Sequence, residues 1–153
     1  SRKYSIKKII FSSSSSVYGT NKKVPFSEKD PVVNQISPYA VTKLSAEYLC
    51  RTYNEVYGLN IICLRLFTVY GPRGRTDMAP YLFTDKIYKE IPIDMYGDGS
   101  SARDYTYVGD IVEGIFSALN KEINFEIINI GLLIVLLCLV STHQCDRRIY
   151  SYV

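Results

Sequence analysis

Phe11-Ser12-Ser13-Ser14-Ser15-Ser16-Val17-Tyr18-Gly19 follows the apolar residues Ile9 and Ile10, and this stretch determines how the rest of the chain is read. A run of serines ordinarily indicates a flexible linker. Here apolar residues stand on both sides, so we expect a strand over Ile6–Phe11 that ends in an ordered row of hydroxyl groups. An apolar, β-branched run is typical of a buried strand in a parallel sheet. The serines would then occupy the strand's carboxyl end, where ligands bind in open α/β sheets.

A second stretch, Ser37-Pro38-Tyr39-Ala40-Val41-Thr42-Lys43, places a tyrosine and a lysine four residues apart. Serine followed by proline is typical of a helix start, and Gly58 is suited to a helix end, so the sequence predicts a helix to about Tyr57. At that spacing the two side chains lie on one helix face, a turn apart. A fixed ammonium favours the ionised form of a neighbouring phenol. With a serine hydroxyl nearby, these groups predict a proton-transfer site that interconverts a carbinol and a carbonyl.

The same helix also allows an ordinary structural interpretation. Lys43, Glu47, Arg51 and Glu55 recur at four-residue intervals, as in a solvated row of salt bridges. Taken alone, the pair of Tyr39 and Lys43 favours this interpretation, and only the other motifs of the chain reverse the preference. We expect the buried face of the helix to consist of apolar residues, namely Ala40, Val41, Leu44, Tyr48 and Leu49.

The remaining pattern alternates strands and helices, which is typical of a doubly wound α/β fold. The polar residues 20–37 predict a loop, in which Val24-Pro25-Phe26-Ser27-Glu28 would serve to position the chain. A strand over Asn60–Leu66 would complete a right-handed βαβ unit. Further along we expect, in order, a helix over Pro80–Lys89, a strand over Ile93–Tyr96, a helix capped by Asp110 and running to about Leu119, and a strand over Phe125–Ile130.

Composition excludes several classes of function. The 153 residues have a formal charge of +3 with no cluster of basic residues, which argues against nucleic-acid binding. The single histidine, His143, excludes most zinc sites and most hydrolase sites that need a histidine base, so no metal is expected. None of the four cysteines forms a Cys-x-x-Cys pair, which predicts reduced thiols and a cytoplasmic protein. The sequence does not begin with a signal peptide.

Four motifs in order carry a resemblance to a known family: SSSSSVYG (12–19), SPYAVTK (37–43), RLFTVYGPRGR (65–75) and GDGSSARDYTYVGD (97–110). From about Lys8 to Gly131 the chain resembles the extended short-chain dehydrogenase/reductase family. Within that family it is most similar to the NAD-dependent nucleotide-sugar epimerases that act on UDP-glucuronate at C4. The resemblance implies a Rossmann-like fold, NAD as cofactor and a UDP-sugar as substrate.

The resemblance also implies roles for individual residues. Tyr39 would be the acid/base, Lys43 would hold the nicotinamide ribose, and Ser14 would bind the reacting hydroxyl, so that all three touch the cofactor site. Phe67 would contact the nicotinamide. The residues implied to bind substrate are Ser15, Ser16, Thr68, Arg75 and Arg103. The fork of an arginine matches a carboxylate or a diphosphate, which suits Arg75 for a uronate and Arg103 for the nucleotide.

The glycine-rich turn that seats the pyrophosphate of NAD does not occur in this sequence. By resemblance, 1–70 would be the C-terminal half of an NAD-binding domain, 71–131 a partial substrate-binding region with a late sheet strand, and 132–153 a tail unlike the family. The chain would then be a fragment that lacks the glycine-rich half and most of the substrate domain. We expect an exposed apolar sheet edge, poor solubility and no tight NAD binding.

Leu132 to Val140 is an unbroken apolar run, too short to cross a bilayer, which needs about twenty residues. The run predicts either the start of the tail that does not resemble the family or a short buried helix. Membrane association is not expected from it.

The function implied by the family is C4 epimerisation of a nucleotide sugar through a 4-keto intermediate, with a homodimer as the full-length assembly. One alternative is an inactive truncated product, or a module that only forms the dimer interface. The other is a 4,6-dehydratase or a UDP-glucuronate decarboxylase. Those enzymes carry an acidic residue in the loop before Val-Tyr-Gly, where this chain has Ser15 and Ser16, so epimerisation is preferred.

Overall fold

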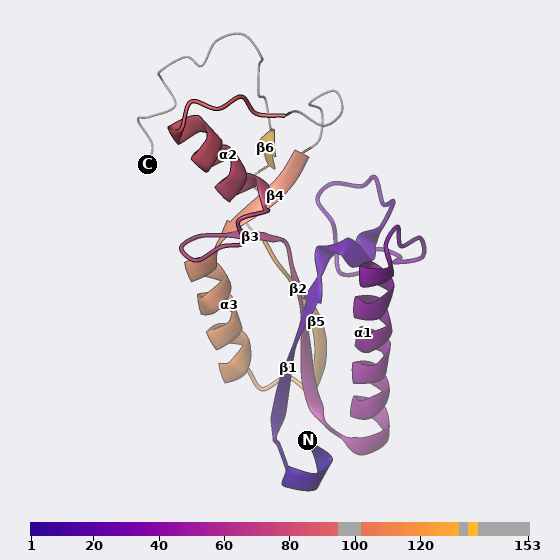
Figure 1. Ribbon diagram of the computed structural model, residues 1–153. Helices are drawn as coiled ribbons and strands as arrows, with labels where there is room; N and C mark the ends of the chain where they lie inside the picture. The colour runs from indigo at the N-terminus through magenta and orange to yellow at the C-terminus, as the bar shows by residue number, and fades with distance from the viewer. Residues whose placement is uncertain (95–101, 132–134, 138–153) are drawn as a thin grey trace. The chain divides into compact units, whose positions relative to one another are not determined.

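The computed structural model describes residues 1–94, 102–131 and 135–137 (Figure 1). The chain divides into two compact units. The first comprises Ser1–Gly74 and Asp104–Ile134, and the second comprises Arg75–Arg103 and Val135–Val153.

A parallel three-stranded sheet forms the centre of the first unit. Its strands are β1 (Lys8–Ser14), β2 (Asn60–Leu66) and β5 (Phe125–Ile130), in the order β1-β2-β5. The register sets Ile10 opposite Ile62 and Leu64 opposite Ile128, so apolar side chains line up across the sheet. The short strand β3 (Thr68–Tyr70) follows β2 and runs parallel to the last residues of β4 (Ala102–Tyr107). The predicted α/β class with a parallel sheet is confirmed.

Helices α1 (Pro38–Tyr57) and α3 (Val108–Asn120) lie on opposite sides of this sheet, as Figure 1 shows. Successive side chains of β2 point to opposite faces of the sheet, so alternate residues contact α1 and α3. Ile62 and Leu64 form a buried cluster with Ala118 of α3. Arg65, on the other parity, faces α1. The carboxyl ends of β1 and β2 thus lie side by side at one edge of a sheet that is covered on both faces.

Helix α1 begins and ends where the sequence predicts. Ser37 has extended backbone angles, and its side chain accepts a hydrogen bond from the Ala40 amide. Gly58 ends the helix in the left-handed conformation with φ +64°, which glycine adopts without a Cβ clash.

The predicted buried face of α1 is only partly correct. Ala40 and Leu44 are buried as expected, but the buried residues that follow them are Glu47 and Asn54. The apolar side chains of Val41, Tyr48 and Leu49 are instead 49–60% exposed. The prediction failed because it assigned burial by hydrophobicity, whereas Glu47 and Asn54 are buried with hydrogen-bond partners that the local pattern does not reveal.

Other boundaries differ in detail from the sequence predictions. Strand β1 continues through the serines to Ser14, and the turn after it is the 3-10 helix η2 (Ser15–Tyr18); a further 3-10 helix, η1 (Arg2–Tyr4), lies near the start of the chain. Helix α3 starts before Asp110, which lies in the first turn with Tyr107 at the N-cap position. Asp110 therefore favours the helix start through its charge near the amino end, and not as the cap.

The second unit contains α2 (Ala79–Tyr88) and β6 (Val135–Leu137). The helix predicted over Pro80–Lys89 is confirmed. Ile93 and Asp94 are not in a strand, and the rest of the predicted strand 93–96 lies outside the described residues. The short helix considered for 132–140 is wrong at residues 135–137, which form a strand. No helix among the described residues has both the length and the apolar character needed to span a membrane.

Candidate active site

The serine row forms a compact turn at the carboxyl end of β1. Ser13 and Ser14 are buried, at 2% and 9% exposure, while Ser16 is exposed. Ser14 is the N-cap of η2: its Oγ accepts from the Ser16 amide at 3.2 Å and donates to Ser16 Oγ at 3.1 Å. The row is therefore ordered by its own hydrogen bonds, as expected of a strand end rather than a linker.

Lys43 lies between this row and Tyr39. Its Nζ donates to the backbone carbonyl of Ser12 at 2.8 Å and lies 5.6 Å from the ring centroid of Tyr39. The same ammonium is 5.4 Å from the centroid of the Phe11 ring. The Tyr39 side chain is 54% exposed, so its phenol does not point into the core. The structure thus brings the lysine to both the tyrosine ring and Ser12, the first residue of the serine row.

Phe67 follows directly on β2. Its amide donates to the carbonyl of Ile130 at 3.4 Å, and its ring lies 6.3 Å from that of Phe26. A Cβ at Gly131 would come within 2.8 Å of the Phe67 ring and 2.9 Å of the Asp104 carboxylate, so a larger residue would force these side chains to move. Thr68, the next residue, begins β3 opposite Tyr105.

Two of the predicted substrate-binding residues, Arg75 and Arg103, belong to the second unit. Arg75 forms a bidentate ion pair with Asp77, with Nε to Oδ1 at 3.0 Å and Nη2 to Oδ2 at 2.5 Å. This pairing raises the pKa of Arg75 and lowers the pKa of Asp77. Both side chains are more than half exposed, so the pair is open to exchange with another carboxylate. Arg103 lies exposed on β4.

A buried polar network joins α1, β1 and β2, and sequence reasoning missed it. The carboxylate of Glu47 accepts from Arg65 Nε at 3.0 Å and from Arg65 Nη2 at 2.7 Å, and it also accepts from Ser13 Oγ. The Arg65 guanidinium lies 4.8 Å from the centroid of the Tyr18 ring, and Tyr18 Oη donates to Asn129 Oδ1 at 2.8 Å. In the sequence, Arg65 could have predicted this network, because a single charged residue inside an apolar strand requires a buried partner.

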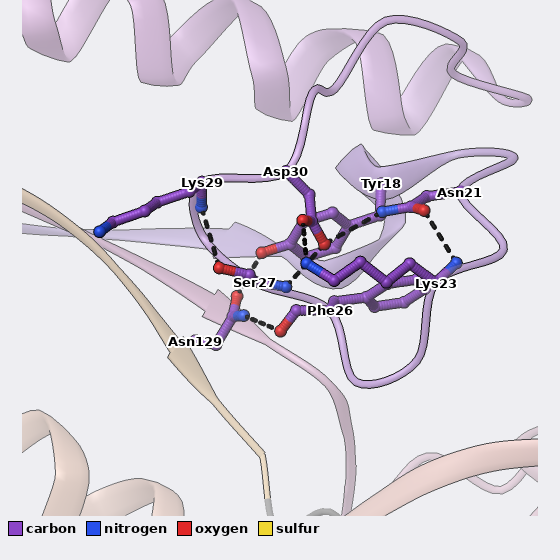
Figure 2. A network of polar contacts seen from close by, with 8 residues as sticks. All are labelled: Tyr18, Asn21, Lys23, Phe26, Ser27, Lys29, Asp30 and Asn129. Atoms are coloured by element: carbon purple, nitrogen blue, oxygen red, sulfur yellow. Dashed lines mark hydrogen bonds and ion pairs between the residues drawn. The ribbon is translucent and has the colours of Figure 1, made fainter.

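The loop before α1 is tied to the end of β5 through Asn129. Its Nδ2 donates to the Phe26 carbonyl at 3.1 Å, its amide donates to Glu28 at 2.8 Å, and the ring of Tyr18 stacks on Phe26 at 4.5 Å. Figure 2 shows Asn129 beside Phe26 and Tyr18, with the Asp30 carboxylate holding the rest of the loop. The loop is therefore ordered against the strand ends that form the site.

The residues present fit one end of a dinucleotide cofactor. An ammonium and hydroxyl groups at the carboxyl ends of parallel strands are donors suited to ribose hydroxyls. The chain's own sequence contains no glycine-rich turn for the pyrophosphate. Chemically, the exposed phenol beside an ammonium can exchange a proton with an alcohol hydroxyl.

Comparison with known proteins gives consistent results. Residues 1–131 match the model of a family described as the NAD dependent epimerase/dehydratase family. A UDP-glucuronate 4-epimerase of Thermodesulfobacterium geofontis is 47% identical over 128 residues, which cover 84% of this chain and 39% of the relative. The chain thus spans about 40% of the length of these curated relatives.

Solved structures show the same similarity. The UDP-glucuronic acid 4-epimerase of Bacillus cereus, in complex with UDP-glucuronic acid and NAD, superimposes with a TM-score of 0.79 at 42% identity, covering 86% of this chain and 42% of that chain. The UDP-glucose 4-epimerase of Thermotoga maritima, with UDP-glucose, gives a TM-score of 0.81 at 37% identity over 88% of this chain and 44% of that chain.

Proposed function

The chain belongs to the NAD dependent epimerase/dehydratase family, and from that membership we propose that it carries the proton-transfer site of a nucleotide-sugar 4-epimerase acting on UDP-glucuronate. The single observation that supports this most is the position of the Lys43 ammonium, between the Tyr39 ring and the backbone of the serine row. Relatives named as UDP-glucuronate 4-epimerases support the choice of sugar.

In the proposed mechanism the side chains of this chain handle protons and orientation. Tyr39 Oη removes the proton from the sugar's C4 hydroxyl and later returns it. Lys43 would hold the ribose hydroxyls of the cofactor and lies beside the Tyr39 ring. Ser14 orients the C4 oxygen, and Phe67 would contact the nicotinamide of the bound cofactor. NAD, when bound, supplies the acceptor and donor of the hydride.

The carboxylate of the sugar would be recognised by Thr68 and Arg75, and the nucleotide diphosphate by Arg103, with Ser15 and Ser16 lining the sugar. Arg75 is supported by its present geometry, since it already holds a carboxylate of its own chain in a bidentate pair. A uronate that replaces Asp77 would make the same two hydrogen bonds.

The experiment is a chimera in which residues 1–131 of this chain replace the matching segment of the Thermodesulfobacterium geofontis enzyme. We expect the chimera to interconvert UDP-glucuronate and UDP-galacturonate. Tyr39→Phe should lower kcat by a factor on the order of 10² to 10⁴, the contribution of a positioned acid/base. Tyr88→Phe, the same change at an 87% exposed position of α2, is the matched control and should leave kcat unchanged.

The two outcomes against the proposal are distinct. Full activity of the Tyr39→Phe chimera would exclude Tyr39 as the acid/base. A pentose or a 4-keto-6-deoxy sugar as product would instead favour the decarboxylase or dehydratase alternative. For the chain by itself we propose no turnover, because no part of its sequence provides a pyrophosphate-binding turn.

A homodimer is the proposed assembly, with α1 at the interface. Val41, Tyr48, Leu49 and Val56 are all exposed on this one helix. An exposed apolar row of this kind favours association with another surface. The alternative of a non-catalytic interface module predicts the same dimer but no activity in the chimera.

The proposed location is the cytoplasm. Cys50 and Cys63 are both free, and burial raises the pKa of both thiols, so neither is primed for oxidation. Cys138 and Cys145 lie outside the described residues.

A further inference from the structure

Glu47 and Arg65 form an ion pair that is almost fully buried, at 3% and 2% exposure. The pair is bidentate, yet Arg65 Nη1 is buried and has no hydrogen-bond partner among the described residues. A buried pair of this kind is weak evidence for stability, because apolar residues of similar size often stabilise as well or better. Stability alone therefore does not account for this buried ion pair.

Glu47 also attaches α1 to the end of β1. Glu47 accepts a hydrogen bond from Ser13 Oγ, and one helical turn earlier Lys43 donates to the carbonyl of Ser12. Two consecutive strand residues are thus held by two helix residues that share a face. Two attachment points restrict both sliding and rotation of the helix against the strand.

The network continues from Glu47 into the serine turn. Arg65 lies against the Tyr18 ring, and Tyr18 ends the η2 turn that Ser14 caps. Tyr18 in turn donates to Asn129 at the end of β5. Glu47 is therefore connected to each strand end around the site.

We propose that Glu47, fixed by Arg65, is a positioning residue that holds the Lys43 ammonium on the serine row beside Tyr39. It acts through Lys43 and Ser13. The proposal rests on the proposed function in one respect, namely that the site which Glu47 positions is a proton-transfer site. Its test uses neither cofactor nor sugar, so an inactive chimera would not affect the result.

The test compares variants of the 153-residue chain by thermal unfolding and by the acetylation rate of Lys43, measured by mass spectrometry against exposed Lys29. Glu47→Gln leaves the Arg65 charge buried without a counterion. The double variant Glu47→Met/Arg65→Met removes both charges and keeps the volume apolar. Glu55→Gln, the same change at an exposed position of α1, is the matched control.

In the parent chain and in Glu55→Gln we expect Lys43 to be acetylated more slowly than Lys29, because its Nζ is hydrogen-bonded. Glu47→Gln should lower the melting temperature and raise the acetylation rate of Lys43. In the double variant the melting temperature should recover, while the acetylation rate of Lys43 should stay high. Recovery of both properties together would overturn the proposal, because a structural role would then account for the pair.

Ser13→Ala provides a milder test should the double variant fail to fold. It keeps the ion pair and removes only the hydrogen bond between Glu47 and the strand. We expect faster acetylation of Lys43 with a smaller loss of melting temperature than in Glu47→Gln. An unchanged acetylation rate in Ser13→Ala would contradict the proposed attachment.

Discussion

Asp30 organises the loop between η2 and α1 around one carboxylate. It accepts from Lys23 Nζ at 2.7 Å, from the Ser27 amide at 2.8 Å and from Asn21 Nδ2 at 3.2 Å (Figure 2). The hydrogen bond from Lys23, followed by that from Ser27, lowers the pKa of Asp30 below its ordinary value. The charged form of Asp30 is thus the form that holds the loop.

This residue predicts an acid-sensitive loop. Since the pKa of Asp30 is lower in the folded state, its contribution to stability is present above the unfolded pKa of about 3.9 and is lost as the pH falls through the folded value. We expect the Ser27 amide resonance to shift with a midpoint below that of an exposed aspartate. Asp30→Asn should abolish this titration and speed amide exchange of the loop at neutral pH. A midpoint at the ordinary value would count against the network.

At the same scale, Tyr39 and Lys43 could be selected from the sequence because their spacing acts within one helix. Glu47 could not, because its partners Ser13 and Arg65 lie 34 and 18 residues away in the chain. Local spacing assigned it to a solvated row, whereas the fold provides it with a buried counterion. The roles of the predicted site residues remain proposals that await the chimera.

Helix α1 is the element whose limits follow most directly from its sequence. Ser37 caps the amino end, and Gly58 provides the left-handed residue at the other. The inward face of the helix could not be predicted in full, because burial was assigned by hydrophobicity and two of the buried residues are polar. Burial of Glu47 and Asn54 is decided by residues of β2 and by Asn124, which come later in the chain.

Removing either cap should destabilise the first unit. Ser37→Ala deletes the acceptor for the Ala40 amide and should cost about 1 kcal/mol in the free energy of unfolding. Ser45→Ala, at an exposed position within α1, is the matched control and should cost nothing. Denaturant titration followed by circular dichroism measures both. Equal stability of the two variants would show that the cap is dispensable.

Gly58→Ala tests the other end of the helix. An added Cβ would meet nothing within 4 Å, so any loss comes from backbone strain at φ +64° alone. We expect a cost of about 1 kcal/mol. Gly58→Asn should lose less, because asparagine tolerates this conformation. If alanine is as stable as glycine, the helix must end in another conformation.

At the scale of the whole molecule, the described sheet of the first unit has a free edge at β1. Within the first unit β1 has a strand neighbour on one side only. A groove of about 390 Å³ lies here, with Ile9, Phe11, Leu49 and Tyr53 among its lining residues. A free, β-branched strand edge beside an open groove makes the β1 edge a candidate site for aggregation with other chains.

Titration with NAD tests whether the chain alone holds the cofactor. Isothermal titration of the chain with NAD should show no binding in the micromolar range, because the chain offers donors for the nicotinamide end only. Micromolar affinity would mean that the chain binds the pyrophosphate without a glycine-rich turn. The T. geofontis chimera is the positive control.

Light scattering tests the assembly. We expect a dimer for the full-length chimera, and a monomer after Val56→Glu, which places a charge in the exposed row of α1. Val56 does not line the groove, so this change tests the α1 row alone, and Glu55→Gln serves as control. A dimer that survives Val56→Glu would place the interface elsewhere.

The first unit is discontinuous, since residues 75–103 interrupt it before β5 completes the sheet. During biosynthesis β2 must therefore wait, with one side unpaired, until Phe125–Ile130 has left the ribosome tunnel. A chain synthesised at roughly 5–20 residues per second spends several seconds in that state. A nascent polypeptide halted between the two segments should thus be a substrate for ribosome-associated chaperones, and release should follow only after the last central strand emerges.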